Sequence, residues 1–198
     1  MPTLTPAPSG RDRSTDPRVD RTRVAVTAAC RAILIEEGWS ALTHHRVAER
    51  SKVARATIYR HWPDTSTLLR DALTSEAVAW TVAESGDPIG NLRAQIHQLR
   101  AVLEGDLGRI IAALIDRAEW EPPITAVKAD IVEQFATILN EMVQRAIAAG
   151  ALRDDLNTEL AVAQLVGPLF YRRFTSGERT SRAFVDAVFD DFFRTHQG

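Results

Sequence analysis

The stretch of sequence that decides the fold is residues 43–69, THHRVAERSKVARATIYRHWPDTSTLL. It predicts two short helices joined by a tight turn, with a third helix starting directly afterwards. The first helix begins at Thr43, whose hydroxyl can accept a hydrogen bond from an unpaired amide of the first turn. The turn falls at 51–53, the second helix covers 55–61, and Pro63 ends that helix because it cannot donate a backbone hydrogen bond.

The second of these helices has two different faces. Ile58 is apolar and is expected to be buried, as are Val47 and Ala48 of the preceding helix. The opposite face presents Arg55, Thr57, Tyr59, Arg60 and His61. A helix-turn-helix places its second helix in the major groove of duplex DNA, and side chains of these types can bond to phosphates and base edges. The segment therefore predicts double-stranded DNA as a partner.

The same segment resembles the tetracycline-repressor (TetR) family of bacterial transcriptional regulators. The family pattern is a helix ending in Gly, a Thr opening the next helix, an Ile-Ala pair, a Gly-Val turn and a Thr-Leu-Tyr-x-His-Phe recognition helix. The matching positions here are Gly38, Thr43, Val47, Ala48, Val53, 57–62, Leu68 and Leu69. The resemblance covers residues 20–70, about a quarter of the chain.

Three positions depart from that family pattern. Ser51-Lys52 stands where the family usually has Ala-Gly, so the turn is expected to differ slightly. Ala54 replaces a common capping Ser, which should weaken the start of the recognition helix by about 1 kcal/mol. Thr65 replaces a Lys that typically contacts phosphate, so one charged contact is expected to be missing.

The resemblance also implies which residues contact DNA. The phosphate contacts are Thr43, Tyr59, His61 and Thr65. The base-edge contacts are His45, Arg55, Ala56 and Thr57, with Ala56 against a thymine methyl group, and His44 and Arg60 are further candidates. The alternative is that these are ordinary surface residues of a short helix.

Composition is ordinary for a globular protein, but the charge is unevenly distributed. Residues 1–70 hold 12 Lys+Arg and 7 Asp+Glu, a net +5, whereas residues 71–198 hold 12 and 19, a net −7. A basic N-terminal third is typical of a DNA-binding domain. No apolar run approaches the roughly 20 residues that span a bilayer, so we expect a cytoplasmic protein without membrane association. The single Cys30 excludes an internal disulfide.

Every long segment has helical periodicity and none alternates with period two. The fold class is therefore all-α, with about nine helices: three in an N-terminal helix-turn-helix domain, one linking helix and five in a C-terminal bundle that forms a dimer. The expected helices outside the motif are 20–38, 65–84, 89–103, 107–120, 124–149, 158–176 and 180–195. The expected domains are a disordered tail at 1–18, a DNA-binding domain at 19–79 and a ligand-binding and dimerisation domain at 80–198. Arginines of the tail and the first helix could enter the minor groove.

Aromatic and polar side chains of the C-terminal bundle could line a small-molecule pocket. The candidates are Trp80, His97, Trp120, Phe135, Phe170, Tyr171 and Arg173. The alternative for each of them is an ordinary core position. Pro168 is expected to kink its helix, which could shape either a cavity or a dimer face.

A homodimer is expected because one helix-turn-helix reads only a few base pairs, so a palindromic operator needs two copies. The last two helices are apolar over a wide arc, which favours a partner helix. The interface candidates are Leu165, Leu169, Phe174, Val185, Phe189 and Phe192. The alternative is that these residues complete the core of the monomer.

No metal site, cofactor or catalytic constellation is expected. His45 and Glu49 are too few ligands for a metal, and adjacent His44 and His45 point in different directions around a helix. The function implied by the resemblance is a repressor released from its operator by an unknown small molecule. The alternatives are a ligand-independent or architectural DNA-binding protein, and a helical enzyme carrying a DNA-binding domain.

Overall fold

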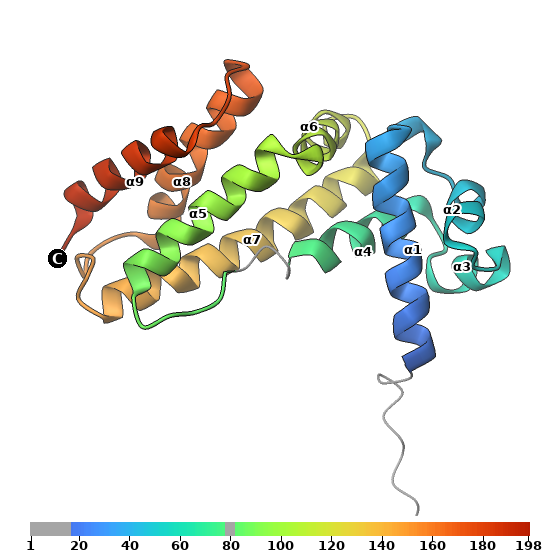
Figure 1. Ribbon diagram of the computed structural model, residues 1–198, viewed down its shortest axis with the longest axis horizontal. Helices are drawn as coiled ribbons and strands as arrows, with labels where there is room; N and C mark the ends of the chain where they lie inside the picture. The colour runs from blue at the N-terminus through green and yellow to red at the C-terminus, as the bar shows by residue number, and fades with distance from the viewer. Residues whose placement is uncertain (1–16, 78–81) are drawn as a thin grey trace, which may run out of the picture.

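The computed structural model describes residues 17–77 and 82–198, and within these residues the chain forms nine α-helices with short connections (Figure 1). The helices are α1 (Pro17–Glu36), α2 (His44–Ser51), α3 (Arg55–His61), α4 (Thr65–Ala77), α5 (Pro88–Glu104), α6 (Asp106–Ala118), α7 (Pro122–Ala148), α8 (Thr158–Phe170) and α9 (Arg182–His196). A 3-10 turn lies at Trp39–Ala41, and a π-helical turn at Tyr171–Thr175 extends α8. The predicted all-α class and helix-turn-helix are thereby confirmed.

The first hydrophobic core joins α1, α2, α3 and α4. Ile33, Val47, Ile58 and Leu68 are completely buried there. The same core takes in apolar residues of α6 and of the first half of α7, including the fully buried Val127. The helix-turn-helix is therefore packed directly against helices that lie far along the chain.

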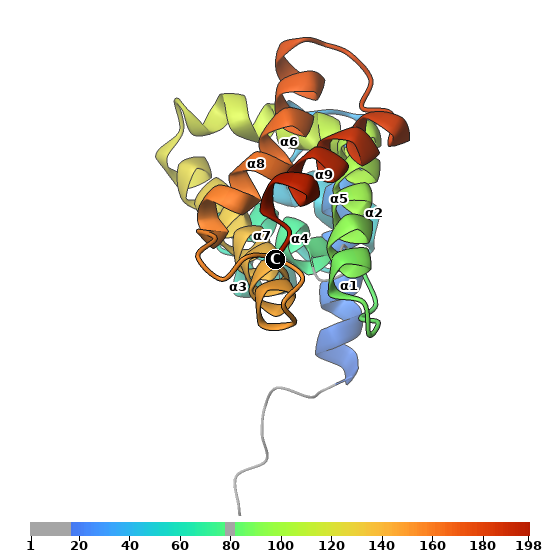
Figure 2. The same cartoon turned by 90° about the vertical axis from the view of Figure 1, so that its left-hand side faces the viewer.

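The second core joins α5, α8, α9 and the later part of α7. Its fully buried side chains include Leu92, Leu139, Leu165 and Phe189. Figure 2 shows α8 and α9 crossing in front of α5 and α7 when the molecule is viewed from that end. Helix α7 thus contributes to both cores and connects them.

Two helices end differently from the expectation. The linking helix was expected to reach residue 84, but α4 ends at Ala77 in the described part and 82–85 are not helical. The helix expected to run to residue 176 is α-helical only to Phe170 and then widens, with the Ser176 amide donating to the Tyr171 carbonyl at 3.0 Å. Pro168 lies three residues before this change and removes one backbone donor from the helix.

No helix in the described ranges is long and apolar enough to cross a membrane.

The turn between α2 and α3 carries backbone strain. Lys52 has φ 59°, and no other non-glycine residue in the described parts of the chain has a positive φ. An L-residue in this left-handed conformation costs about 1–2 kcal/mol, because its Cβ crowds the following carbonyl. Lys52 therefore adopts the left-handed conformation that Gly adopts most easily.

We predict that Lys52→Gly raises the free energy of unfolding by about 0.5–1 kcal/mol, because relief of the strain exceeds the entropy cost of Gly. Urea denaturation measures the change. Lys52→Ala is the matched control: it removes the same charge but keeps the Cβ, and should leave stability nearly unchanged. Lower stability of Lys52→Gly would show that the side chain makes contacts that outweigh the strain.

Candidate nucleic-acid interface

The helix-turn-helix is built from local caps that the sequence predicts. Thr43 lies in the extended region and accepts from the Arg46 amide at 3.1 Å, which starts α2. Asp64 accepts from the Thr67 amide at 2.7 Å, which starts α4 directly after α3. Hydrogen bonds from Ser66 and Thr67 lower the pKa of the Asp64 carboxyl, so the charged cap is favoured. In contrast, Ala54 offers α3 no side-chain cap.

Helix α3 turns one face inward and the other to solvent. Ile58 is completely buried and anchors the helix against the first core. Arg55, Ala56, Arg60 and His61 are exposed, Tyr59 is 47% exposed and Thr57 is half-buried. Thr43, His45 and Thr65 are also exposed. These candidates therefore lie on or beside an accessible recognition helix.

The arginines of α2 form ion pairs with Glu36 and Glu37, where α1 ends, and with Glu49 of α2 itself. Arg46 donates to both carboxylate oxygens of Glu37, at 2.8 and 3.0 Å, and contacts Glu49 at 3.2 Å. Arg50 donates to Glu36 at 2.6 Å and to Glu37 at 3.3 Å. The hydrogen bond from Arg46 is the main reason that the pKa of Glu37 is lowered. These ion pairs hold α2 against the end of α1.

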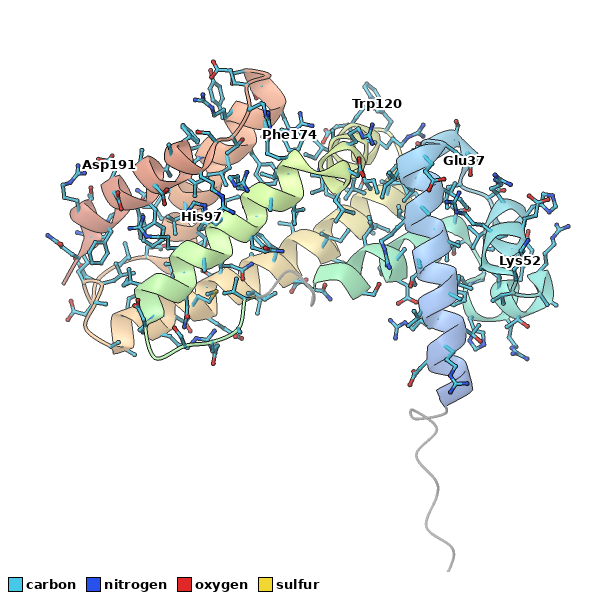
Figure 3. The ribbon with its side chains drawn as sticks, in the orientation of Figure 1. Glu37, Lys52, His97, Trp120, Phe174 and Asp191 are labelled. Carbon is cyan, nitrogen blue, oxygen red and sulfur yellow. The ribbon has the colours of Figure 1, made fainter. Side chains whose placement is uncertain are left out.

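The cations at the turn and on the recognition helix form no ion pair within the described residues and are therefore available to bind an anionic partner. Lys52, Arg55 and Arg60 have no carboxylate partner among the residues that the structure describes. Figure 3 shows Lys52 at the outer end of the helix-turn-helix, directed away from the bundle. Lys52 was absent from the predicted contacts, although its position in an exposed turn beside α3 was a usable signal.

The burial of His44 argues against its predicted contact with DNA. It is only 7% exposed, and its ring lies against Tyr59 with centroids 4.3 Å apart and an angle of 8° between the ring planes. Its Nε2 lies 2.7 Å from the carbonyl oxygen of Trp62. Periodicity could not reveal this, because Trp62 and Tyr59 reach His44 only through the packing of α3 on α2.

The proposed basic arm falls largely outside the described residues. Its first arginines lie within 1–16, of which the structure says nothing. Arg23 is paired with Asp71 of α4 through two hydrogen bonds, so it is not a free cation. Arg21 remains exposed on α1.

Comparison with known proteins agrees with this geometry. The family model "Bacterial regulatory proteins, tetR family" matches residues 26–72, and "Tetracyclin repressor-like, C-terminal domain" matches residues 82–192. The second match alone covers more than half of the chain. This protein belongs to the TetR family.

Individual relatives support the same assignment over almost the whole length. An uncharacterised helix-turn-helix regulator of Bacillus subtilis, YdeS, is 26% identical over 89% of this chain and 90% of its own. A DNA-binding transcriptional repressor TetR of Mycobacteroides abscessus is 22% identical over 88% of this chain and 93% of its own. The crystal structure of the TetR-family regulator SCO0332 superposes with a TM-score of 0.75 and 26% identity, covering 88% of this chain and 97% of the other. The chain is thus a TetR-family helix-turn-helix transcriptional regulator.

The described members of the predicted pocket set in this TetR-family protein do not all face the interior. Trp80 lies outside the described residues. Trp120 is 81% exposed at the α6–α7 connection and points away from the bundle (Figure 3), and Tyr171 is 62% exposed. Neither therefore lines an interior pocket, because each lies at the end of a helix where nothing in the described chain covers it.

The other predicted pocket residues take separate positions in the second domain. His97 of α5 bonds to Asp186 of α9, with its Nε2 2.8 Å from the carboxylate oxygen. Arg173 donates to the Leu103 carbonyl at 2.9 Å, which satisfies an end of α5. Phe135 and Phe170 are half-buried and pack against the second core. Among the predicted pocket residues, these two phenylalanines are the ones that pack on this apolar core.

The predicted dimer residues are corrected by their burial. Leu165, Leu169, Val185 and Phe189 are completely buried within the single chain, and Phe192 is 6% exposed. Half-buried Phe174 packs against the same core and lies edge-on to Phe170. The apolar faces of α8 and α9 cover each other and α5 and α7, so the five buried residues complete the monomer core, whereas the interface role of Phe174 stays a prediction.

The outward side of α8 differs from this buried side. Leu160 is 55% exposed, Gly167 is exposed, and a Cβ added to Gly167 would meet nothing within 4 Å. Pro168 lines an open cleft of about 270 Å³ between α8 and α9, together with Phe192 and His196. Pro168 therefore faces an external groove.

We predict that Ala54→Ser stabilises the recognition helix, because a Ser side chain at the non-helical residue before α3 can accept from an unpaired amide of its first turn. The free energy of unfolding should rise by about 1 kcal/mol. Thermal denaturation followed by circular dichroism measures it. Ala56→Ser, two residues further along and inside the helix, is the control and should give no gain; an equal gain there would exclude capping as the cause.

Proposed function

We propose that this protein is a homodimeric repressor that binds a palindromic operator and is released by a small molecule bound in its C-terminal domain. The observation that carries the DNA-binding part is the recognition helix itself. Its arginines, Arg55 and Arg60, are exposed and unpaired in the described chain, whereas the arginines of α2 are held by Glu36 and Glu37. Direct readout needs such free donors on a rigid element.

The dimer that we propose uses the outward face of α8 together with α9. Leu160 and Gly167 are seven residues apart and so lie on the same side of the helix. Both are accessible, and the space at Gly167 would admit a partner helix. An interface here would place apolar surface of each subunit against the other while leaving α3 free for DNA.

The connection between the two domains supports a ligand-responsive mechanism. Helix α4 belongs to the first core and also contacts α7, where Arg70 Nε lies 2.6 Å from an Asp130 carboxylate oxygen. Because α7 also enters the second core, a ligand that moved α7 would move α4 and with it α3. A ligand can change DNA affinity only through its different affinities for the two conformations. Phe135 and Phe170 are the pocket residues that we retain in this proposal.

The proposal is tested by selecting bound duplexes from a random DNA pool with the purified full chain. We expect a palindrome whose half-sites are about 34–36 Å apart or a multiple of that spacing, with affinity that falls steeply with salt. The selected duplex then serves as the probe for small molecules that release it. Absence of enrichment at low salt would contradict DNA binding, and a single half-site would contradict the dimer.

Within that complex we predict that Arg55 reads a base. Arg55→Ala should weaken binding by about 1–3 kcal/mol and relax the preference at one position of each half-site, as loss of an Arg–guanine contact would. A repeated selection with the variant measures both effects. Arg109→Ala removes an exposed arginine of α6 far from the recognition helix and is the matched control. An unchanged preference would show that Arg55 does not read bases.

A further inference from the structure

The contacts of His44 define a feature of the DNA-binding surface that its sequence position does not predict. The ring covers one face of Tyr59 almost in parallel, at a centroid distance of 4.3 Å. Its Nε2 is 2.7 Å from the Trp62 carbonyl oxygen. A carbonyl oxygen only accepts, so Nε2 must carry the proton in this contact. At 7% exposure His44 has little surface left for DNA.

The Trp62 carbonyl belongs to the end of the recognition helix. Trp62 is the residue that closes α3, with its amide donating to the Ile58 carbonyl at 2.8 Å. Carbonyls at a helix end have no partner within the helix, so a donor from elsewhere stabilises that end. His44 supplies this donor from α2. The Trp62 indole nitrogen in turn donates to Asp71 of α4 at 3.0 Å.

Tyr59 is the side chain that gains from this arrangement. It is 47% exposed, so part of it is covered by protein and the rest faces solvent on the recognition helix. A Tyr on a short surface helix would otherwise sample several rotamers, and ordering it on DNA would cost affinity. The parallel His44 ring restricts the Tyr59 side chain before DNA arrives.

We propose that His44 is a positioning residue: it binds no DNA itself, but orients the Tyr59 hydroxyl for a phosphate contact and holds the end of the recognition helix. The inference rests on the proposed DNA-binding function. It differs from a direct contact by His44 in two measurable ways, because a positioning residue affects the phosphate contact through Tyr59 and does not itself neutralise a phosphate.

The first test is a double-mutant cycle on the selected operator duplex. Tyr59→Phe keeps the ring and removes the hydroxyl, and His44→Leu removes the stacked ring and the donor. Each single variant should bind about 10-fold more weakly, the effect of losing one hydrogen bond to a charged group. The double variant should lose little more than either single variant, because both remove the same contact.

The second test is the salt dependence of binding. A cationic contact to phosphate contributes nearly one unit to the slope of log affinity against log salt. His44→Leu should leave the slope of the wild type unchanged. Arg60→Ala, which removes an exposed unpaired cation from α3, the helix of Tyr59, is the comparison for the loss of a charge at the proposed DNA surface.

Two further variants separate the two contacts of His44 from a general loss of folding. His44→Phe keeps an aromatic ring against Tyr59 but cannot donate to Trp62, whereas His44→Gln keeps a donor without the ring. In the His44→Phe variant, adding Tyr59→Phe should still weaken DNA binding by about 10-fold. In the His44→Gln variant, adding Tyr59→Phe should weaken it no further. Thermal melting of each variant shows that it is folded at the temperature of the binding assay.

Several results would overturn the inference while leaving the proposed function intact. They are an additive double variant with about 100-fold loss, a salt slope lowered by one unit in His44→Leu, or a Tyr59→Phe variant with wild-type affinity. In each case the wild-type protein still binds its operator. Failure of the wild type to select any duplex is a different outcome and overturns the DNA-binding function itself.

Discussion

The burial of α7 in both hydrophobic cores is the constraint on which the rest of the structure depends. Ile124 and Val127, near its start, pack with the helix-turn-helix, whereas Leu139 and Val143 pack with α5, α8 and α9. A helix of this length is stiff over its hydrogen-bonded span. The two cores are therefore connected, within the described chain, by one continuous helix, α7.

Electrostatic pairing then determines which cations remain for DNA. Glu36 and Glu37 at the end of α1 take the arginines of α2, and Asp71 of α4 takes Arg23. Among the residues from α2 to α3, this pairing leaves Lys52, Arg55 and Arg60 without a carboxylate partner in the described chain. Exposed ion pairs of this kind contribute little stability individually. Their larger effect is to direct the available donors to one face of the domain.

The expectations that failed share one physical origin. Periodicity shows that a helix has a wide apolar arc, but it does not show which neighbour covers it. Leu165 and Phe189 were interpreted as a surface for a second subunit, whereas α8 and α9 of one chain bury them. The family resemblance made His44 a further candidate for a DNA contact, whereas the approach of α3 encloses it. Trp120 was a pocket candidate, and the turn after α6 exposes it instead.

Local chemistry explains why the sequence alone determined so much of the DNA-binding half. Thr43 and Asp64 start their helices, Gly38 and Pro63 separate them, and Ile58 marks the inner side of α3; each acts within a few residues of its own position. The covering of α8 by α9, the stack of His44 on Tyr59 and the junction of α4 with α7 were decided only by the tertiary structure. These contacts join residues far apart in the chain or on different helices, and their distances depend on how whole helices cross, which no local pattern specifies.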